Sequence, residues 1–163
     1  MSHPRFVFLV LATCAVACGG RQDGITDPVS LLDAPIALDG HVVLIDNEGD
    51  QAFLLDIKSP EQTVTPQVVA VPHDPQLTAR RNEANEALIL SMGRRATAEE
   101  DAEPAVLTAL SSNGKLRRYE LGDNPFDSLK QSSDGRFAFL WKSKTSQRLL
   151  DNPNEVAIID LRE

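Results

Sequence analysis

The fold is decided by three short apolar runs, AFLLDI (52–57), AVLTAL (105–110) and VAIIDL (156–161). Each of them is preceded by a second run of the same kind, and these stand at 42–45, 87–90 and 136–141. All six runs are short and rich in β-branched or large apolar residues, and no window keeps helical spacing over three turns. The sequence therefore predicts an all-β chain of antiparallel strand pairs.

The pairs are regularly spaced along the chain. From Ile57 to Leu110 the distance is 53 residues, and from Leu110 to Leu161 it is 51. A period of roughly 50 residues made of strands and turns is typical of a β-propeller, in which each repeat is one four-stranded blade. Further strands fit the gaps at 67–71 and 115–121.

We therefore expect residues 36–163 to form about two and a half to three antiparallel, propeller-like blades, which is an incomplete ring because propellers close with about 4–8 blades. Such an arc leaves strand edges and blade faces open. It predicts either a truncated reading frame or self-association of copies through the open blade edges. The alternative fold is a small antiparallel β-sandwich in which the spacing is a coincidence.

The third repeat carries motifs of a known family. Residues 132–139 read SSDGRFAF and resemble the S-P-D-G-R-x-A-x-V start of YVTN-type propeller blades, and residues 154–161 read NEVAIIDL and are similar to their N-x-V-S-V-I-D-L end. Ser133 replaces the proline of the family, and Ala109 replaces the repeat aspartate in the middle copy. The resemblance implies an architecture and no chemistry of its own. Some propellers of this superfamily are lactone hydrolases or metal-dependent lyases, whose sites collect ligands from many blades.

Residues 1–17 have the layout of an export signal, because Arg5 precedes about a dozen apolar residues. That run is too short to span a bilayer, which takes roughly 20 residues. Ala15-Val16-Ala17-Cys18 resembles the lipobox of bacterial lipoproteins. The resemblance implies a membrane-anchored protein of the cell envelope, on the outer membrane or facing the periplasm, with Cys18 as the attachment site for lipid such as palmitate. A plain secretory peptide cut elsewhere, or a buried apolar helix, is the alternative.

Residues 18–35 are rich in Gly, Asp and Pro and predict a flexible tether between this anchor and the domain.

The composition of the chain excludes several classes of protein. The chain has 163 residues and a formal charge of −8, from 16 Lys and Arg against 24 Asp and Glu, so it lacks the basic surface that nucleic acid requires. Its two cysteines, Cys14 and Cys18, exclude a disulfide scaffold or a multi-thiolate zinc site in the domain.

Candidate chemistry is sparse, and we expect no cofactor and no metal. After the signal only His41 and His73 remain, outside any HxxxH or HExxH spacing, so a histidine metal site would need the fold to bring them together. We expect one at a strand edge and the other in a loop. The acidic segment 46–50 invites a calcium interpretation but has its glycine at the wrong place for an EF-hand, and a turn explains it. No G-x-S-x-G, S-x-x-K or phosphate-binding glycine motif is present, so no catalytic residue is assigned.

Two long insertions, 93–104 and 143–154, interrupt equivalent places in the second and third repeats. If the blades form, both insertions emerge on one face, and long loops on rigid β scaffolds often carry binding. The leading hypothesis is a non-catalytic, lipid-anchored, extracytoplasmic module that binds a protein or glycan on that face. The alternative is a truncated propeller-type hydrolase, similar to lactonases, or a lyase.

Overall fold

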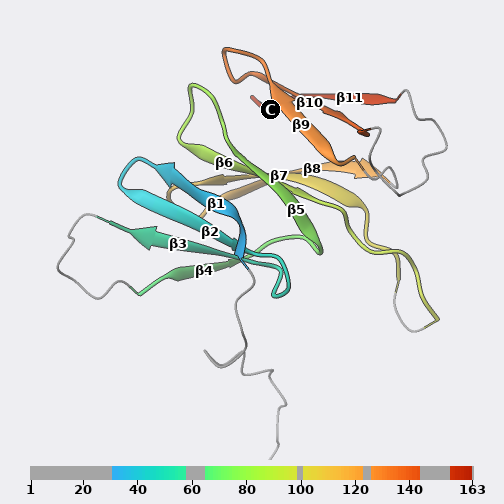
Figure 1. Ribbon diagram of the computed structural model, residues 1–163, viewed down its shortest axis with the longest axis horizontal. Helices are drawn as coiled ribbons and strands as arrows, with labels where there is room; N and C mark the ends of the chain where they lie inside the picture. Colours follow the sequence, from blue (N-terminus) through green and yellow to red (C-terminus); the bar gives the residue numbers. More distant parts are fainter. Residues whose placement is uncertain (1–30, 58–64, 99–100, 123–125, 144–154, 163) are drawn as a thin grey trace, which may run out of the picture.

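The computed structural model of the chain describes residues 31–57, 65–98, 101–122, 126–143 and 155–162. Over these ranges the chain forms eleven strands and no helix, which confirms the all-β expectation (Figure 1). The strands are β1 (Leu31–Leu38), β2 (His41–Asp46), β3 (Gln51–Asp56), β4 (Gln67–Ala70), β5 (Pro75–Arg80), β6 (Glu86–Ser91), β7 (Ala105–Ser111), β8 (Leu116–Gly122), β9 (Ser128–Gln131), β10 (Phe137–Trp141) and β11 (Val156–Asp160). The predicted signal and Cys18 lie outside the described residues.

The strands pair in chain order into three antiparallel sheets. The first sheet is β1-β2-β3-β4, the second is β5-β6-β7-β8 and the third is β9-β10-β11, and these described strands close no barrel. The six apolar runs of the sequence are the second and third strands of the three sheets. β1 begins at Leu31, ahead of the expected domain start at residue 36, because its first two residues pair with the end of β2.

The three sheets share one register. The residue that opens each second strand pairs across the sheet as follows: His41 with Asp56, Glu86 with Ser111, and Phe137 with Asp160. Asp56 and Asp160 are therefore equivalent, as the sequence spacing predicts, whereas their counterpart in the middle sheet is Ser111 and not Ala109. The sequence alignment slips there because β7 is apolar on both faces, so that only its pairing marks the register.

Two apolar cores lie between the three sheets. The first core joins the first and second sheets and contains Ile36, Leu38, Val43, Ile45, Ala52, Leu54, Val71, Ala87, Ile89 and Leu110. The second joins the second and third sheets and contains Leu88, Leu90, Leu107, Ala109, Phe126, Ala138, Leu140 and Leu161. The second sheet thus lies between the other two (Figure 1). Burial on both faces is why β6 and β7 are continuous apolar runs.

The sheets also stack in one sense. We call the side of the second or third sheet that faces the preceding sheet its front, and the opposite side its back. In the first sheet, the back is the side that faces the second sheet, and the front is the other side. In the second strand, positions 2 and 4 face the front and positions 3 and 5 face the back, counted from the opening residue. The back of the first sheet (Val43, Ile45) packs on the front of the second (Ala87, Ile89), and the back of the second (Leu88, Leu90) packs on the front of the third (Ala138, Leu140).

Candidate functional site

The two ends of the stacked sheets differ. At one end, which we call the turn end, lie the β1–β2, β5–β6 and β9–β10 connections. At the other, the insertion end, lie the β2–β3 turn and the long β6–β7 connection. The sequence predicted the partner surface at the insertion end. Residues 144–154 of the other insertion lie outside the described residues.

The turn end is a hydrogen-bonded junction between sheets. The Asp39 N–H donates to Asn85 Oδ1 (2.6 Å), which links the first sheet to the second. The Asn82 N–H donates to Gln131 Oε1 (2.8 Å), which links the second to the third. Gly135 lies so close to this loop that a Cβ on it would sit 1.8 Å from the Asn82 carbonyl oxygen, and its φ of +61° also favours glycine.

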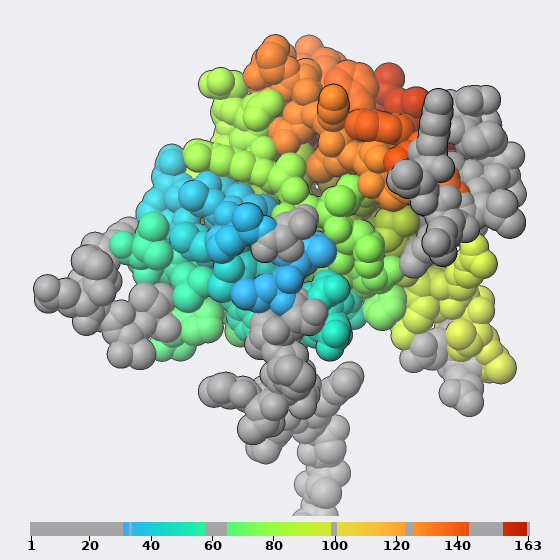
Figure 2. All heavy atoms as spheres, viewed as in Figure 1, coloured from blue at the N-terminus to red at the C-terminus, as the bar shows by residue number. Residues whose placement is uncertain are grey.

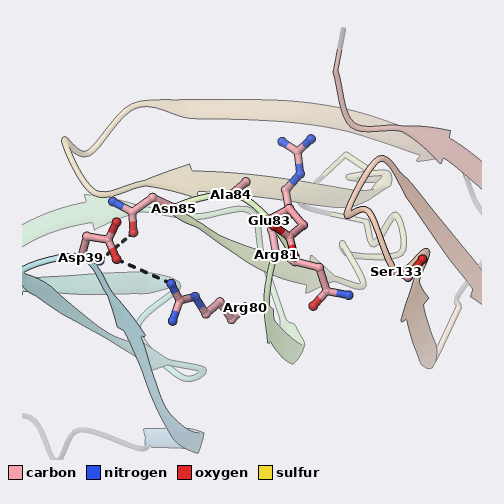
Figure 3. Close-up of a pocket in the computed structure, with 8 residues that line it drawn as sticks. Asp39, Arg80, Arg81, Glu83, Ala84, Asn85 and Ser133 are labelled. Atoms are coloured by element: carbon pink, nitrogen blue, oxygen red, sulfur yellow. Dashed lines mark hydrogen bonds and ion pairs between the residues drawn. The ribbon is translucent and has the colours of Figure 1, made fainter.

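A groove of about 740 Å³ lies on this junction, lined by Asp39, Arg80, Arg81, Asn82, Glu83, Ala84, Asn85 and Ser133. Figure 3 shows Asp39 facing Arg80 and Asn85, with Ser133 on a separate element. Asp39 Oδ1 lies 3.6 Å from Arg80 Nη2. Asp39 has two partners within the lining, whereas Arg81 and Asn82 bond to residues of the β9–β10 connection and its flanks. We therefore interpret the groove as a structural contact between turns.

A charged cluster beneath that junction joins the second sheet to the third. Glu86 accepts hydrogen bonds from Arg81 Nη1 (2.5 Å) and from Arg117 Nη2 (2.7 Å to Oε2). Arg81 Nε also donates to the Gly135 carbonyl (2.8 Å), and Arg117 Nη1 donates to the Leu161 carbonyl (2.9 Å). Burial raises the pKa of the neighbouring Tyr119 hydroxyl, although Arg117 and Arg81 pull it down. We call Glu86, Arg81 and Arg117 together the Glu86 latch.

The insertion end carries a second groove, of about 480 Å³. It is lined by Asp50, Val71, Pro72, His73, Arg94, Glu103, Pro104, Val106, Arg118 and Glu120. Three carboxylates, two guanidinium groups and one imidazole therefore meet around it. The groove draws on both the first and the second sheet and on the base of the insertion.

The base of the insertion is closed by backbone pairing. The Arg94 N–H donates to the Glu103 carbonyl (3.0 Å), and the Glu103 N–H donates to the Arg94 carbonyl (2.8 Å). The two side chains also form an ion pair. Gly93 precedes this bridge with a φ of +66°, and a Cβ there would lie 2.2 Å from the Glu103 carbonyl oxygen. The base therefore holds Arg94 and Glu103 at fixed places on the groove.

His73 is oriented by a carboxylate from the first sheet. Asp50 Oδ2 lies 2.7 Å from His73 Nδ1, and Asp50 Oδ1 accepts from the Asp74 N–H (2.9 Å). Asp50 reaches both because it has a left-handed backbone, with a φ of 52°. A carboxylate on Nδ1 favours the tautomer with its proton there and leaves Nε2 as an acceptor. Within the described part of the chain, Nε2 makes no hydrogen bond.

The two histidines predicted as metal candidates do not meet. His41 opens β2 at the turn end, with Nδ1 3.1 Å from the Asp39 carbonyl, whereas His73 lies in the link before β5 at the insertion end. The acidic segment 46–50 is a turn: Asp46 Oδ1 accepts from the Glu48 N–H (3.2 Å), while Asp50 turns to His73. Among the described residues no group of three or more His, Cys, Asp or Glu side chains could hold a metal ion.

Comparisons with protein-family models, with curated proteins and with solved structures found no match to this chain. In the part of the chain that the structure describes, no helix has the length and apolar character needed to cross a membrane. The chemistry of the site must therefore be read from its own side chains.

The described lining of the insertion-end groove contains no hydroxyl or thiol nucleophile. It can bind charged and hydrogen-bonding groups. Sequence reasoning missed Arg118 and Glu120, although their alternate positions in β8 place them on the same exposed face. It also missed the Asp50–His73 pair, for which the sequence gives no signal, because the two residues meet only through the turn geometry.

Proposed function

We propose that this chain is an exported, lipid-anchored module of β-propeller blades that binds a protein partner at its insertion end and is not an enzyme. Lipid attachment at Cys18 rests on the lipobox-like sequence, and the cell-envelope location follows from it. The insertion-end groove carries the binding role.

Two features of the fold support blades over a sandwich. The first is the common register of the three sheets, in which Asp56, Ser111 and Asp160 take one place. The second is that each back packs on the next front. In a propeller, one rotation about the central axis relates each blade to the next, and this produces both features. In a sandwich two sheets face each other, so the same side of each sheet lies in the contact.

The charge pattern of the groove supports a protein partner. Arg118 and Glu120 from β8, and Arg94 and Glu103 from the insertion, present both signs of charge around a pair of prolines. Complementary charge across an interface steers association and fixes register. The described lining offers no Phe, Tyr or Trp ring on which a sugar could stack, so a glycan is the less favoured ligand.

The anchor is tested by metabolic labelling with a radioactive fatty acid. We expect the wild-type chain and Cys14→Ser to incorporate label, and Cys18→Ser to incorporate none. Label retained by Cys18→Ser would overturn the lipid assignment.

The binding face is tested by photo-crosslinking in the producing cell. A photoreactive residue at Glu120 samples the insertion end, and one at Glu83 samples the turn end as the matched control. We expect protein adducts from position 120 that disappear when Arg118→Glu is added, and none from position 83. Adducts only from position 83, or from neither position, would contradict the proposal. If a purified glycan binds and Arg118→Glu abolishes that binding, the ligand of this face is a glycan and not a protein.

A second candidate is supported by one observation, the Asp50–His73 pair, because a carboxylate that orients an imidazole is typical of general bases. A hydrolase or lyase of the propeller type would then use His73 Nε2 on a lactone, an ester or a related substrate. A hydrolysis screen separates the two functions: turnover that is lost in His73→Ala supports the enzyme, and no turnover supports the binding module.

A further inference from the structure

Exposed apolar side chains in this chain have an unusual distribution. Among the described residues, the large hydrophobic side chains that are more than half exposed are Leu31, Ile57, Val68, Val156 and Ile158. Pairing places Leu31 and Val68 on the front of the first sheet, because Leu31 lies opposite Asp46 and Val68 opposite Phe53. Ile57 directly follows β3, its N–H donates to the Gly40 carbonyl, and alternation puts its side chain on the same face. The other two lie on the back of the third sheet, opposite Trp141 and Phe139. Every one of them is on a terminal face of the stack.

The common register shows what these positions do inside the stack. Ile158 is 62% exposed, whereas its equivalents Leu54 and Ala109 are 3% and 1% exposed. Val156 is 53% exposed, whereas Leu107 at the same place in the second sheet is fully buried. The sequence of the third sheet thus keeps the apolar character of a covered face at positions that the described chain leaves open.

The front of the first sheet is open in the same way. Val42 and Leu44 are partly exposed there, at places where the second sheet has Ala87 and Ile89 fully buried. In both contacts between sheets of the described chain, a back packs on a front. The two open faces are therefore the two halves of an interface that the chain already makes twice.

We propose that the occupant of these faces is a second copy of the chain, joined head to tail. The back of the third sheet of one copy packs on the front of the first sheet of the other, and the same contact repeats on the far side. The described parts of two copies bring six sheets, within the range of about 4–8 blades in which propellers close, whereas those of three copies would bring nine. A two-fold contact of back against back would use a sheet orientation found nowhere within the described chain. The inference rests on the blade arrangement of the proposed function.

The test is sedimentation velocity of the full chain, purified in the form that the cell produces, with detergent only if that form is membrane-bound. At about 10 µM, above the micromolar end of the affinity range for interfaces of standard size, we expect twice the mass of one chain. Val68→Arg and Ile158→Arg each place a charge in one half of the interface. Each should weaken association by about tenfold or more, because a buried unpaired charge is costly.

Mixing the two variants gives the decisive result. One intact front and one intact back remain in the mixture, so it should form a heterodimer through that single intact contact, and this heterodimer should be tighter than the self-association of either variant. Ala102→Arg adds the same charge on the exposed part of the insertion and should leave the mass unchanged. A monomeric wild-type chain, or a Val68→Arg variant that still dimerises normally, would overturn the proposal. Neither result touches the labelling of Cys18 or the crosslinks from Glu120, so the proposed function stands or falls separately.

Discussion

The Glu86 latch makes a prediction about how the second and third sheets are held together. The Glu86 side chain is 17% exposed and its partner Arg81 is 10% exposed, so this ion pair is largely removed from water. Arg117, the second partner, is 30% exposed. Glu86→Gln keeps the shape of the side chain but removes its charge, which leaves two guanidinium groups side by side with no carboxylate.

The expected cost follows from this burial. Removing one partner of a buried ion pair costs about 3–5 kcal/mol, whereas exposed pairs are worth about 0–1 kcal/mol. Because Arg117 is partly hydrated and keeps its bond to the Leu161 carbonyl, we expect Glu86→Gln to lower the free energy of unfolding by about 2–3 kcal/mol. Glu103→Gln is the matched control, because its pair with Arg94 has side chains 44% and 31% exposed and should cost less than about 1 kcal/mol.

The assay is urea denaturation followed by the fluorescence of Trp141, the only tryptophan of the chain, which lies in β10 of the third sheet. Linear extrapolation of the transition gives the free energy of unfolding in water. A Glu86→Gln variant that loses no more stability than Glu103→Gln would refute the latch as an element that holds the sheets together.

Three further predictions use the same measurement. Gly135→Ala should destabilise the chain by more than about 2 kcal/mol, because its Cβ would meet the Asn82 carbonyl oxygen. Gly122→Ala is the control: Gly122 has a similar φ of +67° but open space around it, so the substitution should cost only the backbone strain of about 1 kcal/mol. Leu107→Ala should cost about 2–5 kcal/mol, because it opens a cavity between the second and third sheets, and a cost below 1 kcal/mol would show that this core is not closed. Arg136 and then Arg162 hold the pKa of Asp160 well below its ordinary 3.8, so its stabilising contribution is present above about pH 4 and is lost as the pH falls below that value. The stability difference between wild type and Asp160→Asn should therefore shrink on acidification, and a difference that grows would contradict this assignment.

The apolar second and third strands of each sheet were predicted from the sequence, and so were β4 and β8, at 67–71 and 115–121, whereas the first strand of each sheet was not. The second and third strands of each sheet carry the apolar residues that fill the two cores, so their sequence shows them plainly. The first strands contribute less: β1 adds Ile36 and Leu38 to the first core, β5 has a single buried residue, Pro75, and β9 is the short polar segment SLKQ. Each first strand is an edge strand, which pairs on one side only. Its position is fixed by pairing with the second strand, and its own composition gives a weak signal.

The candidate site shows the same division. The sequence correctly placed His41 at a strand edge and His73 in a loop, and it identified the insertion end as a surface with long loops. The partner of His73 was out of reach, because Asp50 lies 23 residues away and meets it only through a left-handed turn. Side chains that converge from two sheets depend on the register between strands, and in β7 the apolar run conceals that register.

The second sheet lies between the other two, with each back on the next front (Figure 1 and Figure 2). Hydrogen exchange of the backbone amides, resolved by residue, tests it most directly. We predict that the amides of β6 and β7 exchange last, through opening of the whole domain, because both faces of these strands are buried. Exchange of β6 or β7 before the amides of β2 and β10 would contradict the stacked arrangement.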